Sequence, residues 1–165
     1  MIWHMATESN TPKRERPLHV HAELIPLEEV RVQLAKLWLL GSLTTGSILV
    51  LQSLLGKYGQ NVQEVWGWVL PSVMPTLGMV LAVLGYTALD RTLLQSVVRR
   101  TFYDIAWWLS LVYLALLALT VLIQPFASNE PIVLMRMSNL WLGPLQGLVG
   151  SALGVLFVSK KRKND

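Results

Sequence analysis

The sequence predicts an all-α polytopic membrane protein, with four transmembrane helices in a bundle and both chain ends in the cytoplasm. Four windows of 20 to 25 residues contain no Asp, Glu, Lys or Arg. About 20 apolar residues in a helix cross a hydrocarbon core of roughly 30 Å. The windows also lack the charged outer face that helices of a soluble bundle show at helical spacing. The 165-residue chain therefore fits one membrane domain.

The charge-free windows set the expected domain organisation. A flexible cytoplasmic tail over residues 1–25 precedes a transmembrane domain over 26–159, and a basic tail over 160–165 follows it. Unpaired backbone groups are too costly in lipid, so each span must be helical, and strands of a barrel would alternate apolar and polar residues. The spans are expected at about 37–55, 66–89, 105–124 and 140–158.

The first helix is expected to begin before its span. Pro26 suits the first helical position, where a missing N–H does no harm, and Glu28 and Glu29 suit the positive end of the helix dipole. A helix from Pro26 to Leu55 would be roughly 45 Å long and would protrude from the membrane. The glycine-containing segment 56–61 then predicts a turn.

The segment between the second and third spans predicts a short amphipathic helix on the membrane surface. Leu94, Val97, Val98 and Phe102 fall at helical spacing, and the polar residues fall mostly elsewhere, namely Arg91, Gln95, Arg99 and Arg100. The alternative is that residues 90–103 simply continue the two neighbouring spans into water.

The distribution of basic residues predicts the orientation. Twelve Lys and Arg residues lie in the two tails and in the loop between the second and third spans. The other two loops hold one each, Lys57 and Arg136. Lys and Arg collect in short cytoplasmic loops, so both termini are expected in the cytoplasm, most simply at a bacterial inner membrane. This topology accounts for the net charge of +4, so no nucleic-acid partner is expected.

The C-terminal basic cluster predicts contact with the lipid bilayer. Four consecutive cations in a juxtamembrane segment attract anionic lipid headgroups. The cluster consists of Lys160, Lys161, Arg162 and Lys163.

Two prolines in the second span predict an irregularity at membrane depth. Pro71 and Pro75 each lack the N–H that would bond the carbonyl four residues earlier. A freed carbonyl in lipid needs a partner. The pair is therefore either a hinge or gate beside a polar path, or a structural kink whose carbonyls are satisfied by neighbouring helices.

Hydroxyl and amide side chains form stripes on the first and third spans. They could line a narrow water path, or they could bond between helices for about 0.6–2 kcal/mol each. The candidate polar-path residues are Ser42, Thr45, Gln52, Ser110, Tyr113, Thr120 and Gln124.

The fourth span carries the clearest packing pattern. Gly143, Gly147, Gly150 and Gly154 form two GxxxG-type pairs on one face of a helix. Glycines at this spacing let two helix backbones approach closely. The pattern leaves open whether the partner is another span of this chain or another molecule.

Residues suited to catalysis or metal binding are absent from the spans. A proton-coupled transporter or an intramembrane protease would need an ionisable group at depth. The chain has no cysteine, and its three histidines, including His19 and His21, lie in the polar tail, where solvated side chains are expected. No catalytic residue, metal or cofactor is therefore expected.

The loop and span from Leu55 to Trp68, the double-proline span and the segment 138–147 resemble uncharacterised small four-span bacterial inner-membrane proteins. The resemblance implies no activity and no site residues. The leading hypothesis is a non-enzymatic membrane subunit, anchor or scaffold that packs through its glycine face, with another copy or with a membrane or cytoplasmic protein. The alternatives are an oligomeric channel or pore-forming membrane effector gated from the cytoplasm and, behind it, a small transporter.

Overall fold

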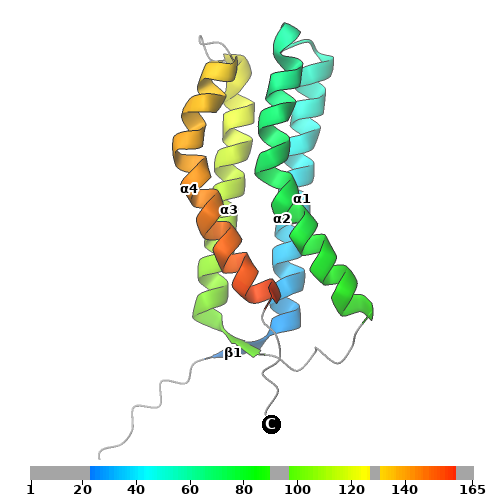
Figure 1. Ribbon diagram of the computed structural model, residues 1–165, viewed down its shortest axis with the longest axis vertical. Helices are drawn as coiled ribbons and strands as arrows, with labels where there is room; N and C mark the ends of the chain where they lie inside the picture. Colours follow the sequence, from blue (N-terminus) through cyan, green and yellow to red (C-terminus); the bar gives the residue numbers. More distant parts are fainter. Residues whose placement is uncertain (1–22, 90–96, 127–130, 159–165) are drawn as a thin grey trace, which may run out of the picture.

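Four long helices make up the computed structural model, which describes residues 23–89, 97–126 and 131–158. They are α1 (Leu27–Leu54), α2 (Val62–Leu89), α3 (Arg100–Ile123) and α4 (Pro131–Val158), shown in Figure 1. Each is long and apolar enough to cross a membrane. The all-α bundle expected from the sequence is confirmed, and its helices indicate a membrane protein.

The helices alternate in direction along the chain (Figure 1). α1 packs against α2 and α3, and α4 packs against the same two helices, whereas α1 and α4 contact each other little. The order around the bundle is therefore α1, α3, α4, α2. In this ring α1 runs parallel to α3, and α2 runs parallel to α4.

A two-stranded pairing lies where α1 and α3 begin. β1 (Leu24–Pro26) pairs antiparallel with β2 (Val97–Arg99), and Ile25 lies opposite Val98. The Arg100 guanidinium also forms a 2.7 Å ion pair with the Glu23 carboxylate. This pairing holds the start of α1 beside the start of α3.

The prediction of a surface helix over residues 90–103 is wrong for residues 97–103, the part that the structure describes. Residues 97–99 form β2, and residues 100–103 are already the first turn of α3. The alternation of Val97 and Val98 between exposed and half-buried positions suits a strand, because successive strand side chains point to opposite faces. The remainder, 90–96, lies outside the described residues.

Three expected boundaries also differ in the structure. The polar tail does not extend to residue 25, because Leu24 already belongs to β1. Pro26 is the N-cap of α1 rather than its first helical residue, because its extended backbone still belongs to the strand. α4 begins at Pro131, well before the expected start of the span at 140, since a helix can continue past the membrane surface.

A tight turn joins α1 to α2, as the sequence predicted. Gly56 and Gly59 have φ angles of 69° and 54°, in the left-handed region that favours glycine. The 3₁₀ turn η1 (Gly59–Asn61) follows. Tyr58 is buried in the turn, where its hydroxyl donates a hydrogen bond to the Gln52 amide oxygen.

The α1–α3 contact forms the centre of the core. Trp38 and Tyr113 are both fully buried, and their rings stack at 5.8 Å between centroids. One turn further on, a Cβ added to Gly41 would lie 2.8 Å from the Leu114 Cδ1 atom. A glycine therefore permits the close approach of α1 and α3 here. On the opposite side of α1, Leu43 is 70% exposed, which suits a lipid-facing surface.

A buried arginine joins α1 to the end of α4. Arg31 donates from Nε to the Leu156 carbonyl and from Nη2 to the Phe157 carbonyl, both at 3.1 Å. The last carbonyls of a helix have no intrahelical partners and carry partial negative charge. Arg31 therefore satisfies the C-terminal end of α4 from the first turns of α1.

Candidate functional site

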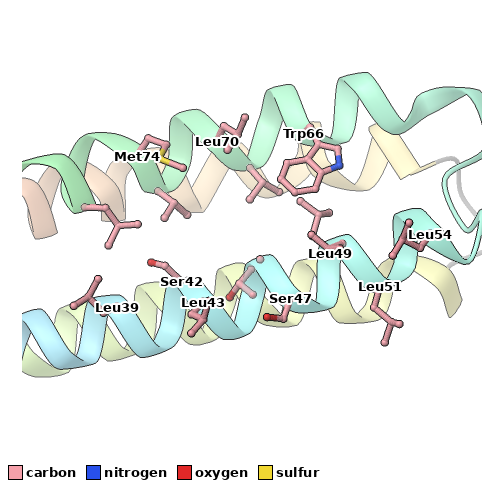
Figure 2. Close-up of a pocket in the computed structure, with 16 residues that line it drawn as sticks. Leu39, Ser42, Leu43, Ser47, Leu49, Leu51, Leu54, Trp66, Leu70 and Met74 are labelled. Carbon is pink, nitrogen blue, oxygen red and sulfur yellow. The ribbon is translucent and has the colours of Figure 1, made fainter.

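A groove of about 750 Å³ lies between α1 and α2. Its walls are almost wholly apolar, and Figure 2 shows Leu39 and Leu43 on α1 lying below Leu70 and Met74 on α2. The Trp66 indole closes one end, where its Nε1 lies 3.2 Å from the Ser53 hydroxyl oxygen. The groove therefore presents an apolar surface to the membrane, with only a few hydroxyl groups in it.

The proline pair lies in the half of α2 that borders this groove. α2 bends midway in Figure 1, and its later half leans away from α1. Pro71 and Pro75 are both inside the helix, so Pro75 has no N–H for the Pro71 carbonyl. That carbonyl is therefore free to accept a hydrogen bond from another helix.

Side chains from α3 and α4 meet this turn. Tyr113 on α3 donates from its hydroxyl to the Ser72 carbonyl at 2.8 Å. Gln146 on α4 donates from Nε2 to the Pro71 carbonyl at 3.3 Å and lies 3.5 Å from that of Ser72. For the Pro71 carbonyl the arrangement has the form of the structural alternative, because α4 supplies the donor.

Four of the seven candidate polar-path residues are hydrogen-bonded within the chain. Tyr113 is engaged with Ser72, and Gln52 accepts the Tyr58 hydroxyl. Thr45 and Thr120 bond the carbonyls of their own helices, one turn back. Of the seven residues, only Ser42 and Thr45 line the α1–α2 groove.

Several buried polar atoms have no hydrogen-bond partner within the described part of the chain. They come from α1, from α3 and from the 3₁₀ turn η3 (Gln124–Phe126) that follows α3. Three of them belong to candidate polar-path residues, which the structure buries without bringing them to a shared ligand position. The four atoms are Trp38 Nε1, Ser42 Oγ, Ser110 Oγ and Gln124 Oε1.

The four glycines of α4 form an open face. Gly143 and Gly147 are exposed, and Gly150 and Gly154 are half-buried. Apart from its chain neighbours and the backbone of its own helix, a Cβ added to any of them would meet no atom of the described chain within 4 Å. No other described helix of this chain therefore packs on that face, and close packing within the chain instead uses Gly41.

Sequence patterns alone did not single out two residues that are important to the structure. In the sequence Arg31 counts only as one of the cytoplasmic cations, although the structure buries it on the packed side of α1. Gln146 gave a signal that could have found it, because an amide in a charge-free window is a natural donor for a carbonyl freed by proline. The basic cluster 160–163 lies outside the described residues.

A metal site is not formed by the described residues, which hold no cluster of three or more His, Cys, Asp or Glu side chains. Comparison with known proteins gave no relative: no family model, no curated protein and no solved structure matches the chain. Its function is therefore inferred from the geometry alone.

Proposed function

We propose that this protein is a non-enzymatic subunit of a membrane assembly, which docks a transmembrane helix of its partner against the glycine face of α4. The observation that carries the proposal is the open space around Gly143, Gly147, Gly150 and Gly154. In lipid, helix association depends on close backbone packing, and small residues at four-residue spacing favour it. A second copy of this chain is the first partner to test.

The spans support a role without acid–base chemistry. Their charge-free windows hold no Asp, Glu, Lys, Arg or His, and Arg31, at the end of the bundle, is engaged with the carbonyls of α4. The proposed position is a bacterial inner membrane with both termini in the cytoplasm. In support, β1, β2 and the end of α4 lie at one end of the bundle (Figure 1), and the segments that hold most of the cations adjoin these elements in the sequence.

The oligomeric pore is the weaker alternative. It would need polar side chains to be available to water, whereas Tyr113, Gln52, Thr45 and Thr120 are bonded within the chain. Purified protein in liposomes would show ion leak if the pore existed, and none is expected.

The direct test compares Gly147→Leu with Leu148→Ile in the full chain. We expect wild type and Leu148→Ile to form an assembly of defined mass in lipid nanodiscs or mild detergent. Gly147→Leu should yield folded monomers, because no atom outside its own helix backbone lies near its Cβ in the described monomer. Unchanged assembly in Gly147→Leu would contradict the proposal.

A partner other than a second copy of this chain can be detected by photo-crosslinking in cells. If wild type is monomeric when pure, a photo-crosslinking residue at Leu148 should give one adduct in membranes, and Gly147→Leu should abolish it. Absence of both self-association and a glycine-dependent adduct would overturn the docking role.

A further inference from the structure

A second, smaller hollow lies between α2 and α4, at the end of the bundle that carries the α1–α2 turn. It has a volume of about 320 Å³ and is lined by Glu64, Gly67, Trp68, Met135 and Arg136. This is the lower end of the range of roughly 300–1,000 Å³ usual for ligand pockets. Unlike the α1–α2 groove, it places two opposite charges around one space.

The two charges are not paired with each other. Glu64 and Arg136 are exposed and come from different helices. Among the described residues the ion pair that forms is Arg100–Glu23, at the other end of the bundle. The carboxylate and the guanidinium therefore both remain available to a ligand that carries both signs of charge.

The Glu64 side of the hollow has two further groups suited to an ammonium ion. The Trp68 indole is held by a 2.8 Å hydrogen bond from Nε1 to Asn139 Oδ1, and an indole face attracts cations. Pro71 has no N–H to donate to the Gly67 carbonyl four residues earlier, which leaves that oxygen with capacity to accept. The Arg136 guanidinium suits a phosphate, which it can bind through two parallel N–H groups.

The position of the hollow matches the level of lipid headgroups. Glu64 is the last charged residue before the window 65–89, and Arg136 is the last before the window 137–159. Trp66 and Trp68 follow Glu64 closely, and tryptophans concentrate at the membrane–water interface. The charged groups therefore border the hydrocarbon core at the same end of two neighbouring helices.

We propose that this hollow binds the zwitterionic headgroup of an aminophospholipid of the phosphatidylethanolamine type. Arg136 binds the phosphate, and Glu64, the Gly67 carbonyl and the Trp68 ring receive the primary ammonium. The site is separate from the glycine face of α4 and does not depend on the proposed function.

The charges predict the selectivity of the site. Phosphatidylglycerol has the phosphate without an ammonium, so Glu64 gains no partner and repels it. Phosphatidylcholine has a quaternary ammonium, which cannot donate hydrogen bonds to Glu64 or to Gly67. Exposed ion pairs are individually weak, so a preference of about two- to fivefold for phosphatidylethanolamine is expected.

The test is native mass spectrometry of the delipidated full-length protein, titrated with each of the three phospholipids. Wild type should retain phosphatidylethanolamine about two- to fivefold better than the other two. Glu64→Gln should abolish that preference, and Arg136→Gln should weaken binding of all three. Lys57→Gln, which removes a charge near the same end outside the hollow, should match wild type. Equal retention of the three lipids by wild type, or an unchanged preference in Glu64→Gln, would overturn the proposal.

Two further measurements check the fold of the variants and the source of the headgroup. The melting temperatures of Glu64→Gln and Arg136→Gln should equal that of wild type, because both side chains are exposed. If either melting temperature falls, the charge-conserving Glu64→Asp and Arg136→Lys should restore the fold and part of the lipid preference. Free phosphoethanolamine at the lipid's concentration should displace no bound lipid, and displacement would contradict a membrane lipid as the ligand. Gly147→Leu should keep the preference, which distinguishes this site from helix docking.

Discussion

The Tyr113 hydroxyl on α3 donates a 2.8 Å hydrogen bond to the Ser72 carbonyl in the proline-containing turn of α2. These two helices are otherwise diagonal in the bundle, so the bond crosses its centre. Trp38 of α1 stacks on the same tyrosine ring, and Gln146 of α4 bonds the neighbouring Pro71 carbonyl. All four helices therefore meet at the irregular turn.

Tyr113→Phe should destabilise the protein by about 1 kcal/mol. The phenyl ring keeps the stacking with Trp38 but removes the donor to Ser72, and hydrogen bonds between membrane helices contribute about 0.6–2 kcal/mol. Reversible unfolding in mixed micelles measures the difference. Ser47→Ala, at an exposed position of α1, is the control and should match wild type. If Tyr113→Phe is as stable as wild type, the bond to Ser72 contributes nothing.

Gln146→Leu should cost less in a Pro75→Ala background than in wild type. Alanine at 75 restores an N–H for the Pro71 carbonyl, so the Gln146 amide is no longer needed there. A double-mutant cycle measured by unfolding should give a coupling of about 0.5 kcal/mol or more. Additive effects would show that Gln146 does not act through this carbonyl.

Gly41→Leu should destabilise the monomer by about 1–3 kcal/mol, the usual cost of overpacking. A Cβ at this position lies 2.8 Å from Leu114, and the remaining leucine atoms have no room between α1 and α3. Gly147→Leu is the matched control, since a Cβ at this position has no neighbour within 4 Å in the described chain outside its own helix backbone. The melting temperatures of the two variants, compared in a detergent that keeps both monomeric, check the contrast, and the reverse order would place the packing glycine on α4.

Arg31→Met should loosen the end of α4. Methionine fills similar volume but leaves the Leu156 and Phe157 carbonyls without their donors, and bonds to charged groups contribute about 1.5–3 kcal/mol. Hydrogen–deuterium exchange should rise at residues 153–158 and stay unchanged in the middle of the spans. Lys36→Met, which removes an exposed cation from the same helix, should leave exchange at 153–158 as in wild type.

Tyr58 should make the protein sensitive to alkaline pH. Burial raises the pKa of Tyr58 to about 12, whereas an unfolded tyrosine has a pKa of about 10. The folded state binds this proton more tightly, so its stabilisation is complete below about pH 10 and is lost as the pH rises towards about 12. Unfolding of Tyr58→Phe should therefore show a smaller loss of stability over that interval than wild type. Parallel pH profiles would contradict this origin.

Much of the fold follows from local sequence. The free energy of placing a segment in lipid is a sum over its own residues, so the charge-free windows predict four apolar helices, which the structure contains. The glycines at 56 and 59 locate the first turn. Local patterns also misled: residues 97–103 have helical spacing of apolar residues, but pairing with Leu24–Pro26, distant in the chain, makes Val97–Arg99 a strand.

Only the tertiary structure decided which contacts the spans make. Gly41 and Gly147 are both glycines in apolar helices, and nothing in the neighbouring sequence tells that α1 approaches α3 while the glycine face of α4 stays open. Likewise, Pro75 determined by itself that the Pro71 carbonyl would be freed, but its donor, Gln146, comes from another helix. The physical reason is that membrane insertion depends on each segment's own composition, whereas packing and hydrogen-bond partners depend on how segments far apart in the chain are brought together.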